Sequence, residues 1–353
     1  MTASLTRRDP MDRSEMTAGT ASLSGYEAEW WAGNVRNTDL SGTLLGAHLC
    51  HAALMSCVPG AFIIQEAARF QPGIPLSEQG MVFMPHLAGL GIAVGSGGEI
   101  LSTYPYFVIG VLHFFVAAFC CAGGLFHTIA GEAKLGDYPE GSWAAQFDYD
   151  WDDFESLSSI LGHHLLCLGV ACLLFACNAA FGNGLYDPLV GEVRQITPNL
   201  NPITLVGYLF GFANGGWTPL GMAAVDNMED LVGGHFLVAI VDIAGAAFHI
   251  INKKPTAFFN NRLIFSFPNG GVTRAGICNS EAILSYSVAS VGFIAISSAI
   301  FTQYCDIAFA PEFYGIDRSG AASIQLILGL NWMVFGGLWH SIRGERLHAL
   351  KNK

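Results

Sequence analysis

Residues 229–254 read EDLVGGHFLVAIVDIAGAAFHIINKK, and this stretch decides the fold. From position 231 to 251, every residue is apolar except His235, Asp242 and His249. About 21 such residues, at about 1.5 Å each, are enough to cross a hydrocarbon core of roughly 30 Å. The pattern therefore predicts a transmembrane helix. His235 and His249 are 14 positions apart, close to four helical turns, so they share one face of the helix with one histidine near each membrane surface.

The same spacing of histidines occurs a second time. His113 and His127 are also 14 positions apart, within the apolar run 106–129. Ionisable side chains inside a membrane are costly and usually have a function. The alternative is an interhelical hydrogen bond to a carbonyl group. Because the arrangement is repeated on two helices, we favour a shared functional role.

The composition is that of a polytopic membrane protein. Of 353 residues, 52% are hydrophobic, only 12% are charged and 42 are glycine. The net charge of −12 argues against nucleic acid as a partner. The nine cysteines include no CxxC pair. No nucleophile with a base, phosphate-binding loop or catalytic carboxylate pair is recognisable, so we expect no enzymatic activity.

The chain is predicted to be an all-α integral membrane protein with six transmembrane helices. They are expected at about 41–65, 105–129, 157–181, 229–252, 280–304 and 321–343. Residues 1–40 and 344–353 are expected to be cytoplasmic tails flanking the membrane domain 41–343. Two further apolar stretches, 80–98 and 202–224, are broken by proline and glycine and are expected to be loops on the non-cytoplasmic face. The acidic, aromatic linker 131–155 suits an interfacial belt, with partner docking as the alternative.

The distribution of positive charge predicts the orientation in the membrane. An even number of helices returns both termini to one side. Thirteen of the 16 Lys and Arg residues fall on that side, and only Arg69, Arg194 and Arg318 fall on the other. By the positive-inside rule, both termini are expected to be cytoplasmic.

The histidines are the candidate functional residues. Nine of the 11 lie in or at the edges of the predicted helices, namely His48, His51, His113, His127, His163, His164, His235, His249 and His340. They are not accompanied by the Cys, Asp or Glu clusters of a zinc or di-iron site. Scattered single imidazoles suit many separate metals, each with its own other ligands. Metallated tetrapyrroles fit this description, because chlorophyll magnesium needs one axial ligand and b-type haem iron usually takes two.

A haem cofactor stays open as an alternative from the pattern alone. Paired histidines on two helices suit a b-type bis-histidine haem protein for electron transfer. This alternative leaves His48, His51, His164 and His340 unused, so we favour chlorophyll.

The glycines beside the histidines also allow two interpretations. They could leave room for a flat macrocycle or could instead be tight helix packing. These glycines are Gly46, Gly123, Gly124, Gly162, Gly233, Gly234, Gly336 and Gly337.

Several motifs resemble the six-helix chlorophyll antennae related to the 43 kDa inner-antenna subunit of photosystem II. They are WWAGNVRNTDLSGTLLGAHLCHA (30–52), MPHLAGLGIAVGSGGE (84–99), PYFVIGVLHFF (105–115), ILGHHL (160–165), EDLVGGH (229–235), SEAILSYSVASVGFIA (280–295) and APEFYG (310–315). The resemblance covers nearly the whole chain. It implies a light-harvesting protein with three antiparallel helix pairs and with pigments in a cytoplasmic and a lumenal layer.

One departure from the photosystem II subunit is informative. That subunit has a large lumenal domain between helices five and six, part of which reaches the manganese cluster, whereas only residues 304–320 join those helices here. A role in water oxidation is therefore excluded. The short form resembles the cyanobacterial IsiA and Pcb proteins. This resemblance implies a multi-pass protein in the lipid of a cyanobacterial thylakoid membrane, binding chlorophyll (a, with b, d or f as alternatives) and carotenoid. The implied partners are photosystem I or photosystem II and copies of the chain itself in a ring or array.

The resemblance also implies a set of chlorophyll ligands. The positions that match the family are Asn34, His48, His51, His113, His127, His164, His235, His249 and His340. His163 replaces an aliphatic residue, so we expect it to be a hydrogen-bonding neighbour, with pigment binding as its alternative. Gly337 replaces a histidine in the family's GHLWH motif, so that pigment is expected to be lost or held through water. Gln325 is an alternative ligand near the other end of this helix. His86 is expected to make a loop hydrogen bond, with pigment binding as its alternative.

Asp242 is the least expected residue. It lies seven positions from both His235 and His249, at mid-membrane, where a bare carboxylate would cost several kcal/mol. We hypothesise that its protonated form donates a hydrogen bond to a pigment carbonyl or formyl group. The same fold could also serve storage of pigment or dissipation of excitation energy, and the sequence leaves this open.

Overall fold

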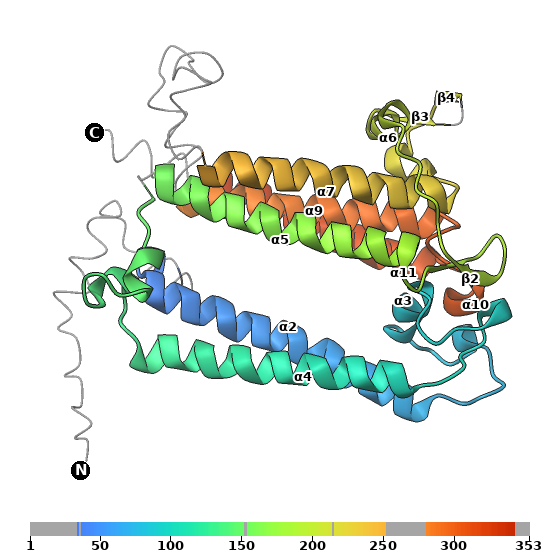
Figure 1. Ribbon diagram of the computed structural model, residues 1–353, viewed down its shortest axis with the longest axis horizontal. Helices are drawn as coiled ribbons and strands as arrows, with labels where there is room; N and C mark the ends of the chain where they lie inside the picture. Colours follow the sequence, from blue (N-terminus) through green and yellow to red (C-terminus); the bar gives the residue numbers. More distant parts are fainter. Residues whose placement is uncertain (1–33, 35–36, 152–153, 214, 252–279, 343–353) are drawn as a thin grey trace.

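The computed structural model describes residues 34, 37–151, 154–213, 215–251 and 280–342 (Figure 1). Within these ranges, six helices are long and apolar enough to cross a membrane. They are α2 (Ser41–Arg69), α4 (Tyr104–Leu125), α5 (Phe154–Phe181), α7 (Met228–Ile251), α9 (Ser280–Tyr304) and α11 (Ser319–Trp332). Two of them continue as π-helices, α4 through η4 (Phe126–Ala130) and α11 through η8 (Met333–His340). The prediction of six spans is confirmed, and the largest difference is that α2 extends past position 65 to Arg69.

The long helices form three antiparallel pairs, as the resemblance implied: α2 with α4, α5 with α7, and α9 with α11 (Figure 1). Glycines facing each other across a pair let the backbones approach closely. A Cβ atom added at Gly60 of α2 would lie 2.9 Å from the carbonyl oxygen of Gly110 of α4, and one added at Gly110 would lie 3.0 Å from that of Gly60. Gly292 of α9 and Gly329 of α11 face each other in the same way.

The connections α2–α4, α5–α7 and α9–α11 gather at one end of the bundle, called here the loop end (Figure 1). The two extra apolar stretches lie in these loops and do not span, as predicted. The first forms α3 (Met84–Gly89) and η3 (Ser96–Gly98), and the second forms α6 (Pro202–Leu209), the hairpin β3 (Phe212–Ala213) with β4 (Gly216–Trp217), and η7 (Gly221–Ala224). A second hairpin pairs β1 (Leu185–Asp187) with β2 (Glu192–Arg194), Leu185 opposite Arg194. The remaining loop helices are η2 (Leu76–Glu78) and α10 (Pro311–Tyr314).

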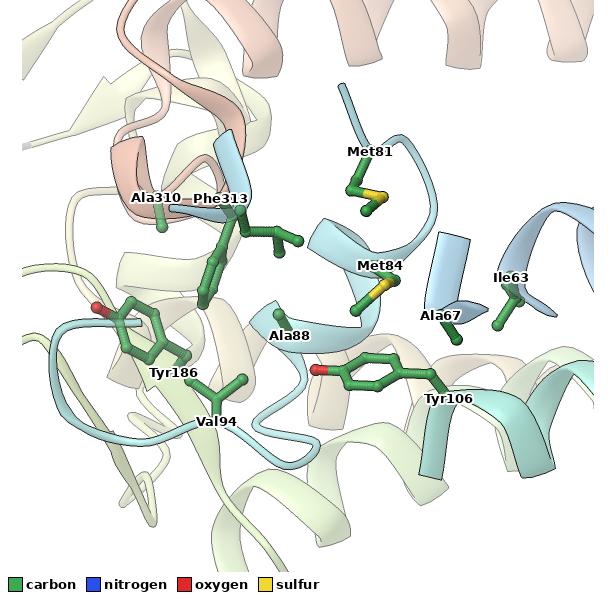
Figure 2. Close-up of a cluster of buried hydrophobic side chains, with 11 residues drawn as sticks. Ile63, Ala67, Met81, Met84, Ala88, Val94, Tyr106, Tyr186, Ala310 and Phe313 are labelled. Atoms are coloured by element: carbon green, nitrogen blue, oxygen red, sulfur yellow. The ribbon is translucent and has the colours of Figure 1, made fainter. Parts of the chain in front are cut away.

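Contacts between different helix pairs are concentrated at the loop end. One buried cluster joins Ile63 of α2 and Tyr106 of α4 to Met84 of α3, Tyr186 of β1 and Phe313 of α10 (Figure 2). A second cluster joins α5, β1, α6 and α7 to the segment after α9, where Cys305 is fully buried. The Tyr186 hydroxyl also donates to Glu312 Oε1 (3.1 Å). Burial, followed by the charge of Glu312, raises the pKa of Tyr186 above its usual value.

Glu66 fastens the first loop to the end of α2. Its side chain is only 1% exposed. Oε1 accepts from the backbone N–H groups of Val82 (2.7 Å) and Phe83 (3.1 Å), and Oε2 accepts from those of Phe83 (3.0 Å) and Met84 (2.8 Å). These N–H groups begin α3 and have no intrahelical partner, so Glu66 satisfies them from a neighbouring helix.

The linker after α4 packs against the start of α2, at the opposite end of the bundle. Ser41 Oγ accepts from the backbone N–H of Leu135 (2.8 Å) and donates to Asp148 Oδ1 (2.5 Å). Tyr149 and Trp151 both donate to the carbonyl oxygen of Thr38, at 3.0 and 2.9 Å. Burial, with Asp39 and Asp148, raises the pKa of Tyr149 to about 12, so this tyrosine stays protonated as a donor at neutral pH.

The predicted orientation is only partly covered by the described residues. Arg69, Arg194 and Arg318 all lie at the loop end, and Lys134 lies at the other end. All twelve of the remaining Lys and Arg residues, most of the predicted N-terminal tail and the whole of the C-terminal tail lie outside the described ranges. The cytoplasmic location of both termini stays a prediction.

Candidate functional site

Three of the predicted ligand histidines share one local geometry. Nδ1 of His48, His113 and His235 lies 2.8 Å from the carbonyl oxygen four residues earlier, that of Leu44, Ile109 and Leu231 respectively. A carbonyl oxygen can only accept, so Nδ1 must carry the proton. The lone pair of a neutral imidazole is then on Nε2, the nitrogen that points away from the helix. This is the tautomer that a metal-ligating histidine needs, and the bond at Nδ1 fixes the ring orientation.

His249 also has its Nδ1 anchored, but by a side chain of a neighbouring helix. Its Nδ1 lies 3.1 Å from Ser158 Oγ, and that hydroxyl lies 3.2 Å from the carbonyl oxygen of His249. Both contacts are satisfied when Nδ1–H donates to the hydroxyl and the hydroxyl donates to the carbonyl. Ser158 is 5% exposed on α5, so the α5–α7 pair itself leaves Nε2 of His249 as the free nitrogen.

His86 and His163 have this geometry too, although neither was expected to be a primary ligand. Nδ1 of His86 lies 2.8 Å from the carbonyl oxygen of Val82, and Nδ1 of His163 lies 2.7 Å from that of Ser159. The expected loop hydrogen bond of His86 is therefore present. Its ring also meets Tyr314 edge-on, with centroids 5.4 Å apart.

His127 and His340 lie in the two π-helical segments, η4 and η8. Nδ1 of His127 is buried and has no hydrogen-bond partner among the described residues. π-Helical turns inside α-helices are rare and frequent at functional sites. Both helices thus change geometry where the sequence places a ligand. The π-helices could not be foreseen from composition or periodicity.

The remaining predicted ligands are less constrained. His51 and His164 are exposed on α2 and α5, and Asn34 is exposed before α2. Gln325 is different, because its Oε1 accepts a hydrogen bond of 3.1 Å from Thr302 Oγ1, a buried group on the partner helix α9. That bond links Gln325 to the partner helix. It also uses one of the two lone pairs of Oε1, the atom proposed to bind a metal.

The helices distribute these residues into two layers. His113, His235 and Gln325 lie in the halves of α4, α7 and α11 nearer the loop end. The other layer, toward the opposite end of the bundle, contains His48, His51, His127, His163, His164, His249 and His340. A two-layer arrangement is what the sequence resemblance implied.

Most of the glycines beside the histidines pack against protein, which favours the packing alternative over room for a macrocycle. A Cβ atom at Gly124 would lie 2.8 Å from the Cys50 backbone nitrogen, and one at Gly162 would lie 3.0 Å from that of Ile250. Gly46, Gly233 and Gly336 are equally crowded by protein atoms. Gly234 alone among the eight has nothing within 4 Å. Only at Gly234, among these described glycines, does the chain leave fully open space next to a ligand candidate.

Asp242 lies at the α5–α7 interface. A Cβ atom added at Gly169 of α5 would lie 3.1 Å from the Asp242 Cβ atom. Within the described ranges, no hydrogen bond or ion pair satisfies its carboxyl group. The half-buried carboxyl group therefore retains its full capacity to donate or accept.

The arrangement suits separate metals better than shared ones. Among the described residues, no group of three or more His, Cys, Asp or Glu side chains could hold a metal ion together. The two helices with the 14-residue histidine spacing, α4 and α7, belong to different pairs, because α4 packs on α2 and α7 packs on α5. A bis-histidine haem needs the two histidines on facing helices, so this pairing counts against the haem alternative.

Few residues of the spans are fully buried. Between 17% and 22% of the residues in the apolar window of each span are buried. Large apolar side chains such as Phe119, Leu174 and Ile240 are 81%, 66% and 62% exposed. These exposed apolar side chains offer a surface that lipid or apolar ligands can cover.

Known proteins resemble this chain over most of its length. A family model described as "Photosystem II protein" matches residues 25–324. The chain is 46% identical over 319 residues to the chlorophyll a/b light-harvesting protein PcbC of Prochlorothrix hollandica, an alignment that covers 90% of this chain and 80% of that protein. It is 44% identical over 321 residues to the chlorophyll a/b light-harvesting protein Pcb of Fischerella muscicola, covering 91% and 94% respectively.

Proposed function

Because this chain belongs to the photosystem II protein family and is similar to Pcb light-harvesting proteins over about nine-tenths of its length, we propose that it is a chlorophyll-binding antenna protein of the thylakoid membrane. Its six apolar helices suit a multi-pass protein. Association with a photosystem follows from the family. Whether the partner is photosystem I or photosystem II, and whether copies of the chain form a ring or array around it, are further parts of the proposal.

The observation that carries the proposal is the repeated anchoring of Nδ1. At His48, His113 and His235 the helix's own carbonyl oxygen holds the proton on Nδ1, and at His249 the Ser158 hydroxyl does so. Each ring then offers one neutral nitrogen, at one fixed position, outside the helix. Chlorophyll, when bound, supplies light absorption, and its magnesium takes one axial ligand of this kind. We propose the same role for Asn34, His51, His127, His164 and His340.

The chain's own contribution is to fix positions. Rigid helices, close packing at glycines and anchored imidazoles set where and in which orientation each pigment is held. The exposed apolar side chains along the spans exclude water from the same spaces. Fixed separations and orientations between pigments allow excitation energy to pass between them and on to a photosystem. In this proposal no chemical bond is made or broken.

The pigment composition is a finer part of the proposal. We propose chlorophyll a as the main pigment, with chlorophyll b as the first alternative, since the two similar proteins are named for both. Carotenoid is expected against the exposed apolar surface. Gln325 and His86 are secondary candidates for magnesium ligation. Gly337 offers no ligand, so a site there would have to be held through water.

Asp242 is proposed to bind the periphery of a pigment rather than its metal. Its carboxyl group has no partner within the described part of the chain, and a bare carboxylate at mid-membrane is costly. A protonated carboxyl group can donate a hydrogen bond to a keto or formyl oxygen. His235 and His249, two turns away on either side, would hold the nearest macrocycles.

The experiment that tests the function is an absorption spectrum of the purified protein, as isolated and after dithionite. We expect intense red bands that reductant does not change, at positions that identify the chlorophyll. A sharp α band that appears only on reduction would mean that histidine pairs hold haem iron, and it would overturn the proposal.

A further inference from the structure

We propose that His163 is an additional axial ligand that binds a chlorophyll of its own, on a face of α5 different from that of His164. This inference rests on the proposed function. The sequence resemblance places the ligand at His164 and makes His163 a hydrogen-bonding neighbour, replacing an aliphatic residue. The structure points to a different role for His163.

The first observation is the state of the imidazole. His163 Nδ1 lies 2.7 Å from the carbonyl oxygen of Ser159, the same contact that His48, His113 and His235 make with their own helices. This bond places the proton on Nδ1 and leaves the lone pair on Nε2. His164, by contrast, has no hydrogen bond within the described ranges. Of the two neighbours, His163 is the one already fixed in the tautomer of a ligand.

The second observation is the position of the ring. His163 is eight residues into the span that begins at Glu155, about 12 Å along the helix, which would place its free nitrogen below the membrane surface if this helix crosses the bilayer. Gly162, the preceding residue, packs against Ile250 of α7. The side chain of His163 projects about 100° further around the helix, and it is exposed. A buried or lipid-facing polar nitrogen without a partner is costly, and the described residues provide none.

The third observation is the surface around the ring. The side chains three positions before and three and four positions after His163 are Ile160, Leu166 and Cys167, and all three are exposed. They form an apolar surface one turn to either side of the imidazole, against which a flat macrocycle can lie. Because adjacent helix residues diverge by about 100°, His163 and His164 cannot ligate the same metal. Each histidine requires its own pigment.

The test compares the chlorophyll content of purified variants. His163→Leu is expected to bind one chlorophyll fewer per protein than the unaltered chain, His164→Leu also one fewer, and the double variant two fewer. Ser159→Ala is the matched control, because it keeps the carbonyl oxygen that anchors Nδ1, and it should keep the full pigment content. Helix content by circular dichroism separates pigment loss from misfolding.

A second measurement distinguishes the loss of a ligand from poor folding of the variant. His163→Gly removes the imidazole, and imidazole added during reconstitution with chlorophyll should restore the missing pigment. The proposal is overturned if His163→Leu keeps the full chlorophyll content while His164→Leu loses one. It is also overturned if added imidazole restores nothing to His163→Gly. A failure of the proposed function itself looks different, because the unaltered protein would then contain no chlorophyll.

Discussion

A histidine on a membrane helix can present either ring nitrogen, and the carbonyl oxygen four residues earlier decides which. At His48, His113, His163 and His235 that carbonyl accepts from Nδ1. The helix therefore selects the tautomer without any other polar residue. Anchoring by a backbone carbonyl oxygen suits a protein in which only 12% of residues are charged, because no carboxylate has to be buried to orient each ligand.

Replacing His235 by leucine should remove one chlorophyll. His235 is anchored to Leu231 and lies against Phe175, with ring centroids 4.5 Å apart. Leucine keeps an apolar contact with Phe175 but offers no nitrogen to magnesium. Pigment extraction and quantitation of purified His235→Leu measure the change. Val238→Leu, a change at an exposed apolar position one turn away, should leave the pigment content unaltered. An unchanged content in His235→Leu would remove this residue from the ligand set.

Replacing Asp242 should shift the pigment bands without removing a pigment. If the protonated carboxyl group donates to a macrocycle carbonyl, Asp242→Leu abolishes that bond and Asp242→Asn retains a donor. Resonance Raman spectra in the carbonyl-stretching region should then show one hydrogen-bonded carbonyl becoming free in Asp242→Leu only. If the absorption, fluorescence and Raman bands of Asp242→Leu all stay in place, Asp242 is a helix-packing residue.

At the scale of helices, the glycine pairs set how closely the antiparallel partners approach. A Cβ atom at Gly110 would lie 2.6 Å from Ile64 Cγ1 as well as 3.0 Å from the Gly60 carbonyl oxygen. Gly110→Ala is therefore expected to destabilise the α2–α4 pair by about 1–3 kcal/mol, the usual cost of overpacking. Gly89→Ala is the matched control, since nothing lies within 4 Å of the added atom. Thermal denaturation followed by circular dichroism compares the two, and equal midpoints would contradict the interface described.

The capping of α3 by Glu66 makes a separate prediction. Glu66→Ala leaves the N–H groups of Val82, Phe83 and Met84 without their acceptor, and Met84 is fully buried. The expected loss is about 3 kcal/mol of unfolding free energy. Glu66→Gln keeps one carbonyl oxygen and should lose less. Proteolysis of the first loop, measured alongside thermal stability, should increase in the order unaltered chain, Glu66→Gln, Glu66→Ala. A loop equally resistant in all three proteins would show that the cap is dispensable.

The six spans could be predicted because each requires only a long apolar run, such as residues 231–251. The helix pairs followed from family resemblance. The sequence left two roles open for Gly162 and Gly233, because crowding at a glycine depends on which segment lies opposite, here Ile250 of α7 for Gly162 and the loop residue Asn199 for Gly233. The role of Glu66 could not be predicted either, because its carboxylate oxygens accept from backbone N–H groups of a loop 16 to 18 residues later in the chain. The anchoring of His163 is a local contact, but it depends on a side-chain rotamer, and the family resemblance favoured a different role.

At the scale of the whole molecule, the orientation in the membrane is the prediction to test. A protease site inserted into the turn 188–191, between β1 and β2, should be protected in sealed vesicles whose outer surface is cytoplasmic. A site inserted into residues 139–142 of the linker should be cut in the same vesicles. Both positions are exposed turns that tolerate insertion. The opposite cleavage pattern would place the termini on the lumenal side and reverse the assignment from positive charge.

The buried cluster at the loop end also has a consequence for the order of biosynthesis. It contains Met84 from the first loop, Tyr186 from the second and Phe313 from the third. A ribosome-bound chain that has released the first two hairpins still lacks Phe313, so the cluster can close only when synthesis is nearly finished. Each hairpin can pair early through its own glycines, and the first two loops contact each other directly, since Asn183 Nδ2 donates to the carbonyl oxygen of Gly91 (2.6 Å). Chains truncated before position 310 should therefore keep an incomplete cluster that lacks Phe313, and they should be more open to quality-control proteases than the full chain.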